Sequence, residues 1–129
     1  MATRIREKAE ARRQNKDTRP YAIVRYVRMS PSKVRIVLDT IRGQKVEDAA
    51  AILANSTTSA AEVCLKLLNS AIANAENNKG LNRADLIVDE TYVCPGPTLK
   101  RLDIRARGRA NRLLKRTCHI TIKLGNVEQ

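Results

Sequence analysis

The sequence predicts an α+β fold in which three helices pack on a small antiparallel sheet and a long β-hairpin projects from the body. Three observations carry this prediction. Segments with the apolar spacing of helices occupy the middle of the chain, and segments with the composition or alternation of strands lie on both sides of them. A strongly basic stretch, KRLDIRARGRANRLLKR (100–116), stands between two predicted strands. A helical layer on one antiparallel sheet is the simplest assembly of these elements.

The first strand and the first helix of the body are expected at YAIVRYVRM (21–29) and SPSKVRIVLDTIRG (30–43). β-branched residues and tyrosines favour the strand. Ser30 suits the N-cap of the helix, Pro31 its first position and Gly43 the residue after its end. Apolar residues at intervals of three and four predict one buried stripe on this helix, composed of Val34, Val37, Leu38 and Ile41.

Two further helices are expected before residue 80. VEDAAAILANS predicts a short, alanine-rich helix at about 46–54. Ser59-Ala-Ala-Glu62 has the pattern of a capping box and predicts the start of a longer helix, which ends before Gly80. The predicted apolar stripe of this longer helix consists of Ala61, Cys64, Leu65, Leu68, Ile72 and Ala75.

The remaining strands of the sheet are expected at DLIVDETYV (85–93) and TCHITIKL (117–124). Pro95-Gly-Pro97 ends the first of them. Strict alternation in the second places two sets of side chains on opposite faces. One set is Cys118, Ile120, Ile122 and Leu124, and the other is Thr117, His119, Thr121 and Lys123.

The basic stretch fits two conformations. As a helix it would carry leucines and alanines on one side and arginines around the rest, a pattern typical of helices that lie on membranes or in RNA grooves. As two strands it would form a hairpin that turns near Gly108, which is a natural connection between two neighbouring strands. Periodicity alone leaves both interpretations open.

The positive charge is concentrated in two segments. The chain has a net charge of +12, of which residues 1–28 carry +6 and residues 100–116 carry +7, whereas residues 29–99 carry −1. We therefore expect a basic N-terminal extension at 1–19 that is flexible without RNA. We expect one globular domain at 20–129, with a hairpin arm at about 94–120. Such an asymmetry is typical of arms that anchor a protein to a nucleic acid.

Several classes of function are disfavoured by the composition. No apolar run is long enough to cross a membrane, and three widely spaced cysteines argue against a disulfide framework and for a reducing, cytosolic location. The chain has no phosphate loop, and Asp89 and Glu90 are expected to diverge on a strand, so we expect no enzyme. Cys94, Cys118 and His119 lack the spacing of metal ligands, and we expect no metal and no cofactor.

The lack of aromatic residues bears on how RNA would be recognised. The chain has three tyrosines and no phenylalanine or tryptophan, so contacts of arginine with phosphate, sugar and RNA shape are expected rather than base stacking. An architectural DNA-binding protein with a basic β-ribbon arm is the alternative, although the Arg-Ala-Arg-Gly-Arg tip has no apolar or proline wedge. A third hypothesis is that the basic stretch binds a membrane surface in the way that basic amphipathic peptides do.

Several motifs in a fixed order resemble the bacterial large-subunit ribosomal protein L-twenty-two family. They are NSAIANAENN (69–78), GPTLKR (96–101), RARGRA (105–110) and LLKRTCHITI (113–122). RYVRMSPSKVRIVLDTIRG (25–43) is similar to the N-terminal strand and first helix of that family, and the resemblance covers roughly residues 20–124. Cys94-Pro95 departs from the acidic residues that are frequent there, and Cys118 from a common serine.

The resemblance implies a structural constituent of the large ribosomal subunit, located in the cytoplasm. It implies binding to large-subunit rRNA, a role in assembly, and a hairpin tip that lines the nascent-peptide exit tunnel near a macrolide site. The implied partners are this rRNA, other large-subunit proteins and the nascent polypeptide, with no membrane and no homo-oligomer. The expected rRNA-binding residues are Arg25, Arg28, Ser30, Lys33, Arg35, Lys100, Arg101, Arg105, Arg107, Arg109, Arg112, Lys115, Arg116 and His119. The expected tunnel tip is Ile104, Arg105, Ala106, Arg107, Gly108, Arg109 and Ala110.

Overall fold

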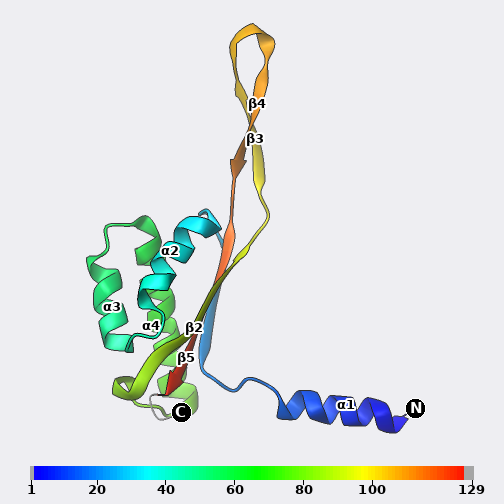
Figure 1. Cartoon of the computed structure of the whole chain (residues 1–129), viewed down its shortest axis with the longest axis vertical. Coiled ribbons are helices and arrows are strands. Elements are labelled where there is room, and N and C mark those ends of the chain that lie inside the picture. The colour runs from blue at the N-terminus through cyan, green and yellow to red at the C-terminus, as the bar shows by residue number, and fades with distance from the viewer. Residues whose placement is uncertain (1, 127–129) are drawn as a thin grey trace.

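Helices cover one side of a small sheet, and a thin two-stranded arm rises from one end of that sheet (Figure 1). The computed structural model describes residues 2–126. Met1 of the expected extension and residues 127–129 of the expected domain lie outside the described residues. The predicted α+β architecture, with three helices on an antiparallel sheet and a projecting hairpin, is confirmed.

The sheet contains three antiparallel strands, β1 (Tyr21–Val27), β2 (Leu86–Pro95) and β5 (Cys118–Asn126). The last strand lies in the middle and pairs with both others. Its predicted alternation is confirmed, because the side chains of Cys118, Ile120, Ile122 and Leu124 are all fully buried. This inner face of the sheet supplies one half of the hydrophobic core.

The helical layer supplies the other half of the core. It consists of α2 (Pro31–Ile41), α3 (Val46–Asn55) and α4 (Ser59–Lys79). The predicted stripe of α2 is confirmed by the burial of Val34, Val37, Leu38 and Ile41. Ser30 is the N-cap residue as predicted, although its side chain makes no capping hydrogen bond, and Gly43 follows the helix with a positive φ of 76°.

The start of α4 differs from the predicted capping box. Thr58, not Ser59, is the N-cap residue, and its side chain makes no capping hydrogen bond. The extended backbone of Thr58 instead lets its carbonyl accept a hydrogen bond from the Ala61 N–H at 3.0 Å. The buried face of α4 is also wider than predicted, since it includes Leu67 and Ala71 while Leu65 is only partly buried. The reason is that α4 packs against two helices and the sheet at once.

The N-terminal extension contains a helix that the sequence analysis did not predict. Helix α1 (Ala2–Gln14) lies apart from the body in Figure 1. Its alanine, arginine, glutamate and lysine residues all have high helix propensity, which accounts for a helix without any apolar face. Residues 3–14 are all exposed. The expectation that this extension moves freely without RNA stays a prediction.

The basic stretch forms a hairpin, not a helix. Strands β3 (Leu99–Ile104) and β4 (Ala110–Lys115) pair in antiparallel register from Leu99 opposite Lys115 to Ile104 opposite Ala110. A single 3₁₀ turn at Ala106–Gly108 joins them, as the predicted turn near Gly108 requires. Arg107 and Gly108 both have positive φ values, 60° and 69°, and glycine adopts such a conformation without steric cost.

Candidate RNA interface

The arm presents its basic side chains to solvent on both faces. Cross-strand partners share a face of a β-ribbon, so the register places Arg101 beside Leu113 on one face and Leu102 beside Arg112 on the other. Leu102 and Ile104 are 72% and 84% exposed. A ribbon of only two strands, with eight cations, one carboxylate and no core of its own, is marginally stable in water. Contacts with an anionic partner would neutralise the excess positive charge and would cover a ribbon that has no core.

Three interactions fix the ends of the arm. At the tip, the Arg105 N–H donates to the Arg109 carbonyl at 2.8 Å, and the Arg105 guanidinium pairs with Asp103 at 2.9 Å. At the base, the Thr117 hydroxyl donates to the Pro97 carbonyl at 2.6 Å. The arm is therefore a defined extension of the sheet, and its turn is its most distant point from the body (Figure 1).

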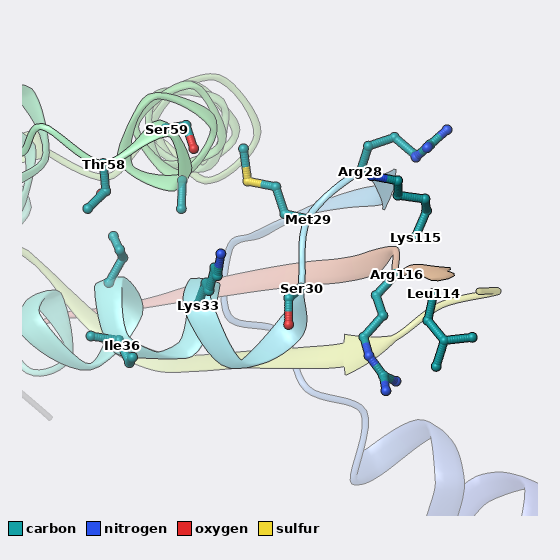
Figure 2. Close-up of a pocket in the computed structure, with 12 residues that line it drawn as sticks. Arg28, Met29, Ser30, Lys33, Ile36, Thr58, Ser59, Leu114, Lys115 and Arg116 are labelled. Carbon is teal, nitrogen blue, oxygen red and sulfur yellow. The ribbon is translucent and has the colours of Figure 1, made fainter. Parts of the chain in front are cut away.

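A groove at the base of the arm joins residues from distant parts of the chain. Its volume is about 770 Å³, and Figure 2 shows the side chains that line it. Arg28, Ser30 and Lys33 come from the end of β1 and the start of α2, whereas Lys115 and Arg116 come from the arm. Met29, Ile36 and Leu114 give the groove apolar walls. Five of the sequence-predicted site residues thus meet in one place, with four positive charges among them.

The other predicted site residues lie outside this groove. Arg25 is exposed on β1. The Arg35 guanidinium donates to the Val93 carbonyl at 3.1 Å and so helps to hold α2 on β2, a structural role that the sequence analysis missed. His119 lies on the sheet face away from the helices, where its Nδ1 accepts a hydrogen bond from the Tyr26 N–H at 3.0 Å.

An ion-pair cluster that sequence reasoning missed fixes the segment before β1. Arg19 pairs with Asp17 at 2.8 Å, with Glu90 at 3.3 Å and with Asp89. Lys123 pairs with Asp17 at 2.9 Å and with Glu90 at 2.7 Å. Hydrogen bonds from Arg19 and Lys123 hold the pKa of the Asp17 carboxyl well below its usual range. Glu90 and Asp17 raise the pKa of Lys123 to about 12.

The expectation that Asp89 and Glu90 diverge is wrong. The pairing of β2 with β5 shifts register between Val88 and Glu90, which is a β-bulge. Strict alternation would send the two carboxylates to opposite faces, but the bulge lets both of them reach Arg19. A bulge leaves no clear signal in a single sequence, so the cluster could not have been predicted from periodicity.

Neither the cysteines nor the helices suggest another kind of site. Within residues 2–126, no group of three or more His, Cys, Asp or Glu side chains could hold a metal ion. Cys64 and Cys118 are buried, and burial raises the pKa of the Cys64 thiol to about 11, so this thiol stays protonated. No helix in the described part of the chain combines the length and apolar character that a membrane crossing requires.

Comparison with known proteins decides between the candidate families of nucleic-acid binders. Residues 22–125, which include the sheet, the groove and the arm, match the family described as ribosomal protein L22p/L17e. The chain belongs to this family. It is 56% identical over 101 residues to the large ribosomal subunit protein uL22 of Acetivibrio thermocellus. The aligned region covers 78% of this chain and 81% of that protein. Membership confirms the resemblance found in the sequence and makes the chain a structural ribosomal protein, not an enzyme.

Proposed function

We propose that the chain is a constituent of the large ribosomal subunit in the cytoplasm and binds large-subunit rRNA through its arm and the groove at its base. The observation that carries this proposal is the arm itself, an exposed ribbon with eight cations and one carboxylate. RNA phosphates supply the counter-charge that such a ribbon lacks, and arginine forks suit phosphate geometry. Ordering of the arm between RNA segments would also assist folding of the rRNA during assembly.

The stem and the tip of the arm have different roles in this proposal. Lys100, Arg101, Arg112, Lys115 and Arg116 lie toward the body, where they neutralise phosphates of the flanking RNA. Residues 104–110 lie at the far end, where they reach the wall of the nascent-peptide exit tunnel. The small side chains of Ala106, Gly108 and Ala110 keep that wall thin. The partners of the tip are the nascent polypeptide and macrolides, and the body contacts neighbouring large-subunit proteins.

The first test measures retention on large ribosomal subunits after a high-salt wash. One variant replaces four stem cations by glutamine, at Lys100, Arg101, Arg112 and Lys115. The matched control replaces four exposed cations of the helical body and the segment after it, at Lys45, Lys66, Lys79 and Arg83. Both variants lose the same charge, but only the stem variant should dissociate during the wash.

The second test distinguishes RNA binding from the alternative, an architectural DNA-binding protein. It compares the affinity of the full chain for large-subunit rRNA and for duplex DNA of equal length at the same salt concentration. Preference for the folded RNA is expected, because the turn at residues 105–109 carries no proline and no apolar side chain larger than alanine that could be inserted between base pairs. Equal or tighter binding to duplex DNA would contradict the proposed function.

A further inference from the structure

The helices leave the outer face of the sheet uncovered (Figure 1). The register of the strands and the contact of Tyr26 with His119 place all three tyrosines of the chain on this face. Tyr21 and Tyr92 occupy outward positions of β1 and β2. Ile23 of β1 and Tyr92 pair with the same residue of β5, Thr121. Tyr21, Tyr26 and Tyr92 are 53%, 64% and 43% exposed, and Ile23 is 43% exposed. The chain has no phenylalanine or tryptophan, so its three tyrosines are its only phenyl-type rings, and all three share one surface. We call this surface, with Tyr21, Ile23, Tyr26 and Tyr92, the tyrosine face.

A strained turn of the backbone places Tyr26 on the tyrosine face. The pairing of β1 with β5 shifts register between Val24 and Val27, so both residues between them can point outward. Tyr26 has a positive φ of 58°, which is unusual for a bulky side chain and costs free energy. The Tyr26 ring meets the His119 imidazole edge to face, with 4.8 Å between ring centroids. Strain of this kind persists only where the surroundings hold the residue in place.

The charges around the tyrosine face favour an anionic partner. The nearby carboxylates of Asp17 and Glu90 are both paired with cations. Arg25, next to Tyr26 on β1, pairs in contrast with no carboxylate among the described residues. Since Nδ1 of His119 accepts the Tyr26 N–H, Nε2 of the neutral ring carries the proton and is a donor. An unpaired guanidinium group beside exposed rings suits a nucleic acid better than an apolar protein segment.

We propose that the tyrosine face binds a single-stranded segment of RNA by stacking its bases on Tyr26 and Tyr92. This inference rests on the proposed function, since it assumes that the partner of the chain is RNA. It adds a second binding surface, separate from the arm, and a second mode of recognition. Aromatic rings on an open sheet stack unpaired bases in a sequence-tolerant manner.

The spacing of the rings determines which RNA conformation fits. Adjacent strands lie about 4.8 Å apart, so β1 and β2, with β5 between them, are separated by roughly 10 Å. Tyr26 and Tyr92 are further apart than this, because Tyr26 lies beside His119 whereas Tyr92 pairs with Thr121. Bases in a duplex are stacked too closely to occupy both rings at once. The tyrosine face therefore selects an extended strand whose bases are splayed apart, such as a loop or a bulge, and not an RNA helix.

Tyrosine fluorescence of the full chain tests the proposal directly, because every intrinsic fluorophore lies on this face. The probes are a short single-stranded RNA, an abasic RNA of the same length and a duplex RNA. Base stacking predicts strong quenching by the single-stranded RNA and little quenching by the other two, although all three carry phosphates for the arm. Quenching that is equal for abasic and normal RNA would overturn the proposal.

Paired substitutions at Tyr92 and Tyr26 separate the ring from the hydroxyl group. Tyr92→Phe keeps the ring and should bind single-stranded RNA as the wild type does. Tyr92→Leu keeps an apolar side chain without a ring and should weaken binding roughly 5- to 150-fold, the effect of one lost stacking contact. Tyr26→Phe and Tyr26→Leu should behave in the same way. Equal affinity of the Phe and Leu variants would show that stacking does not occur.

A parallel titration separates failure of this inference from failure of the proposed function. Arm binding depends on charge, so the stem variant should lose affinity for rRNA whether or not the tyrosines stack. If the leucine variants bind RNA normally while the stem variant does not, the arm binds RNA and the tyrosine face does not. If the stem variant also binds normally, the proposed function itself is wrong.

Discussion

The backbone N–H of Gly96 donates a hydrogen bond to the carbonyl of Thr117 at 2.9 Å, at the point where the sheet becomes the arm. A Cβ atom on residue 96 would lie 2.5 Å from the Thr117 hydroxyl oxygen and 3.2 Å from the His119 ring. The Thr117 hydroxyl also holds the Pro97 carbonyl. This close approach makes the base of the arm a tightly packed junction at which only glycine fits without a shift of its neighbours.

We expect Gly96→Ala to destabilise this junction. The added methyl group must displace the Thr117 hydroxyl, at a cost of about 1–3 kcal/mol in the free energy of unfolding. Thermal unfolding of Gly96→Ala, Thr117→Ala and the double variant measures the coupling between the two sites. The double variant should be more stable than the sum of the single effects predicts, because one substitution makes room for the other. Additive effects would exclude the proposed clash.

Core substitutions test the assignment of the helical stripes. Leu38 on α2 and Leu68 on α4 are fully buried, and their replacement by alanine should lower the free energy of unfolding by about 2–5 kcal/mol without RNA. Ile36→Ala is the matched control, since Ile36 lies on the exposed side of α2. Chemical denaturation of the three variants gives the comparison. A control as unstable as the core variants would contradict the assignment.

The ion-pair cluster before β1 should respond to pH. The pKa values of Asp17 and Glu90 are lowered in the folded state. Their contribution to stability is therefore present above about pH 4, and it is lost as the pH falls through the folded-state pKa values. The pKa of Lys123 is raised to about 12. Its contribution to stability is therefore complete at pH values below the ordinary pKa of lysine, and it is lost as the pH rises through 12.

NMR signals of the segment before β1 provide the measurement. The amides of Thr18 and Arg19 should shift toward random-coil positions in acid while those of α2 and α4 remain unchanged. Arg19→Gln should produce the same shift at neutral pH, because Arg19 holds three carboxylates. Lys66→Gln removes an isolated exposed pair with Glu62 and serves as the control. Native positions of both amides in Arg19→Gln would show that the cluster does not hold this segment.

Binding to rRNA should depend steeply on salt. If the arm and the groove neutralise about six phosphates, the logarithm of the association constant should fall against the logarithm of salt concentration with a slope of roughly −4 to −5. Tyr92→Leu should lower the affinity but keep this slope, whereas the stem variant should have a shallower one. Filter binding over a range of salt concentrations measures both. A flat response of the wild type would refute an electrostatic interface.

Local patterns predicted the body of the fold because they coincide with its packing. The apolar intervals of α2 and the alternation of β5 each match a single buried face. Local patterns did not determine the conformation of the basic stretch, since a helix and a hairpin both fitted its sequence. The pairing of β2 with β5 brings the two ends of this stretch together, and that tertiary contact favours the hairpin. Local periodicity contains no information about such a contact.

The sequence predicted which basic residues make up the candidate site, but not how the fold arranges them. The cations of the arm follow from the charge distribution, and the turn from Gly108. The two bulges, at Val24/Val27 and Val88/Glu90, were invisible to an argument from strict alternation. They bring Tyr26 to the outer face and both acidic side chains to Arg19. The expectation that base stacking plays no part stays untested, and it was made from the number of tyrosines without knowledge of their shared position on one face.

The most direct test of the central claim compares two changes in the arm. One variant replaces residues 105–109 by Asn-Gly, which closes the paired strands after Ile104 and before Ala110 with a two-residue turn. The other is the stem variant without its four cations. A length control keeps the full length of the tip and changes only Arg105, Arg107 and Arg109, each to glutamine.

The measurement is incorporation into large ribosomal subunits together with macrolide susceptibility of cells that carry each variant. We predict that the shortened tip is incorporated and changes the macrolide response, because it alters the tunnel wall and leaves the stem intact. The stem variant should be incorporated poorly, and the length control should resemble the wild type in incorporation. Loss of incorporation with the shortened tip, together with normal incorporation of the stem variant, would contradict the account.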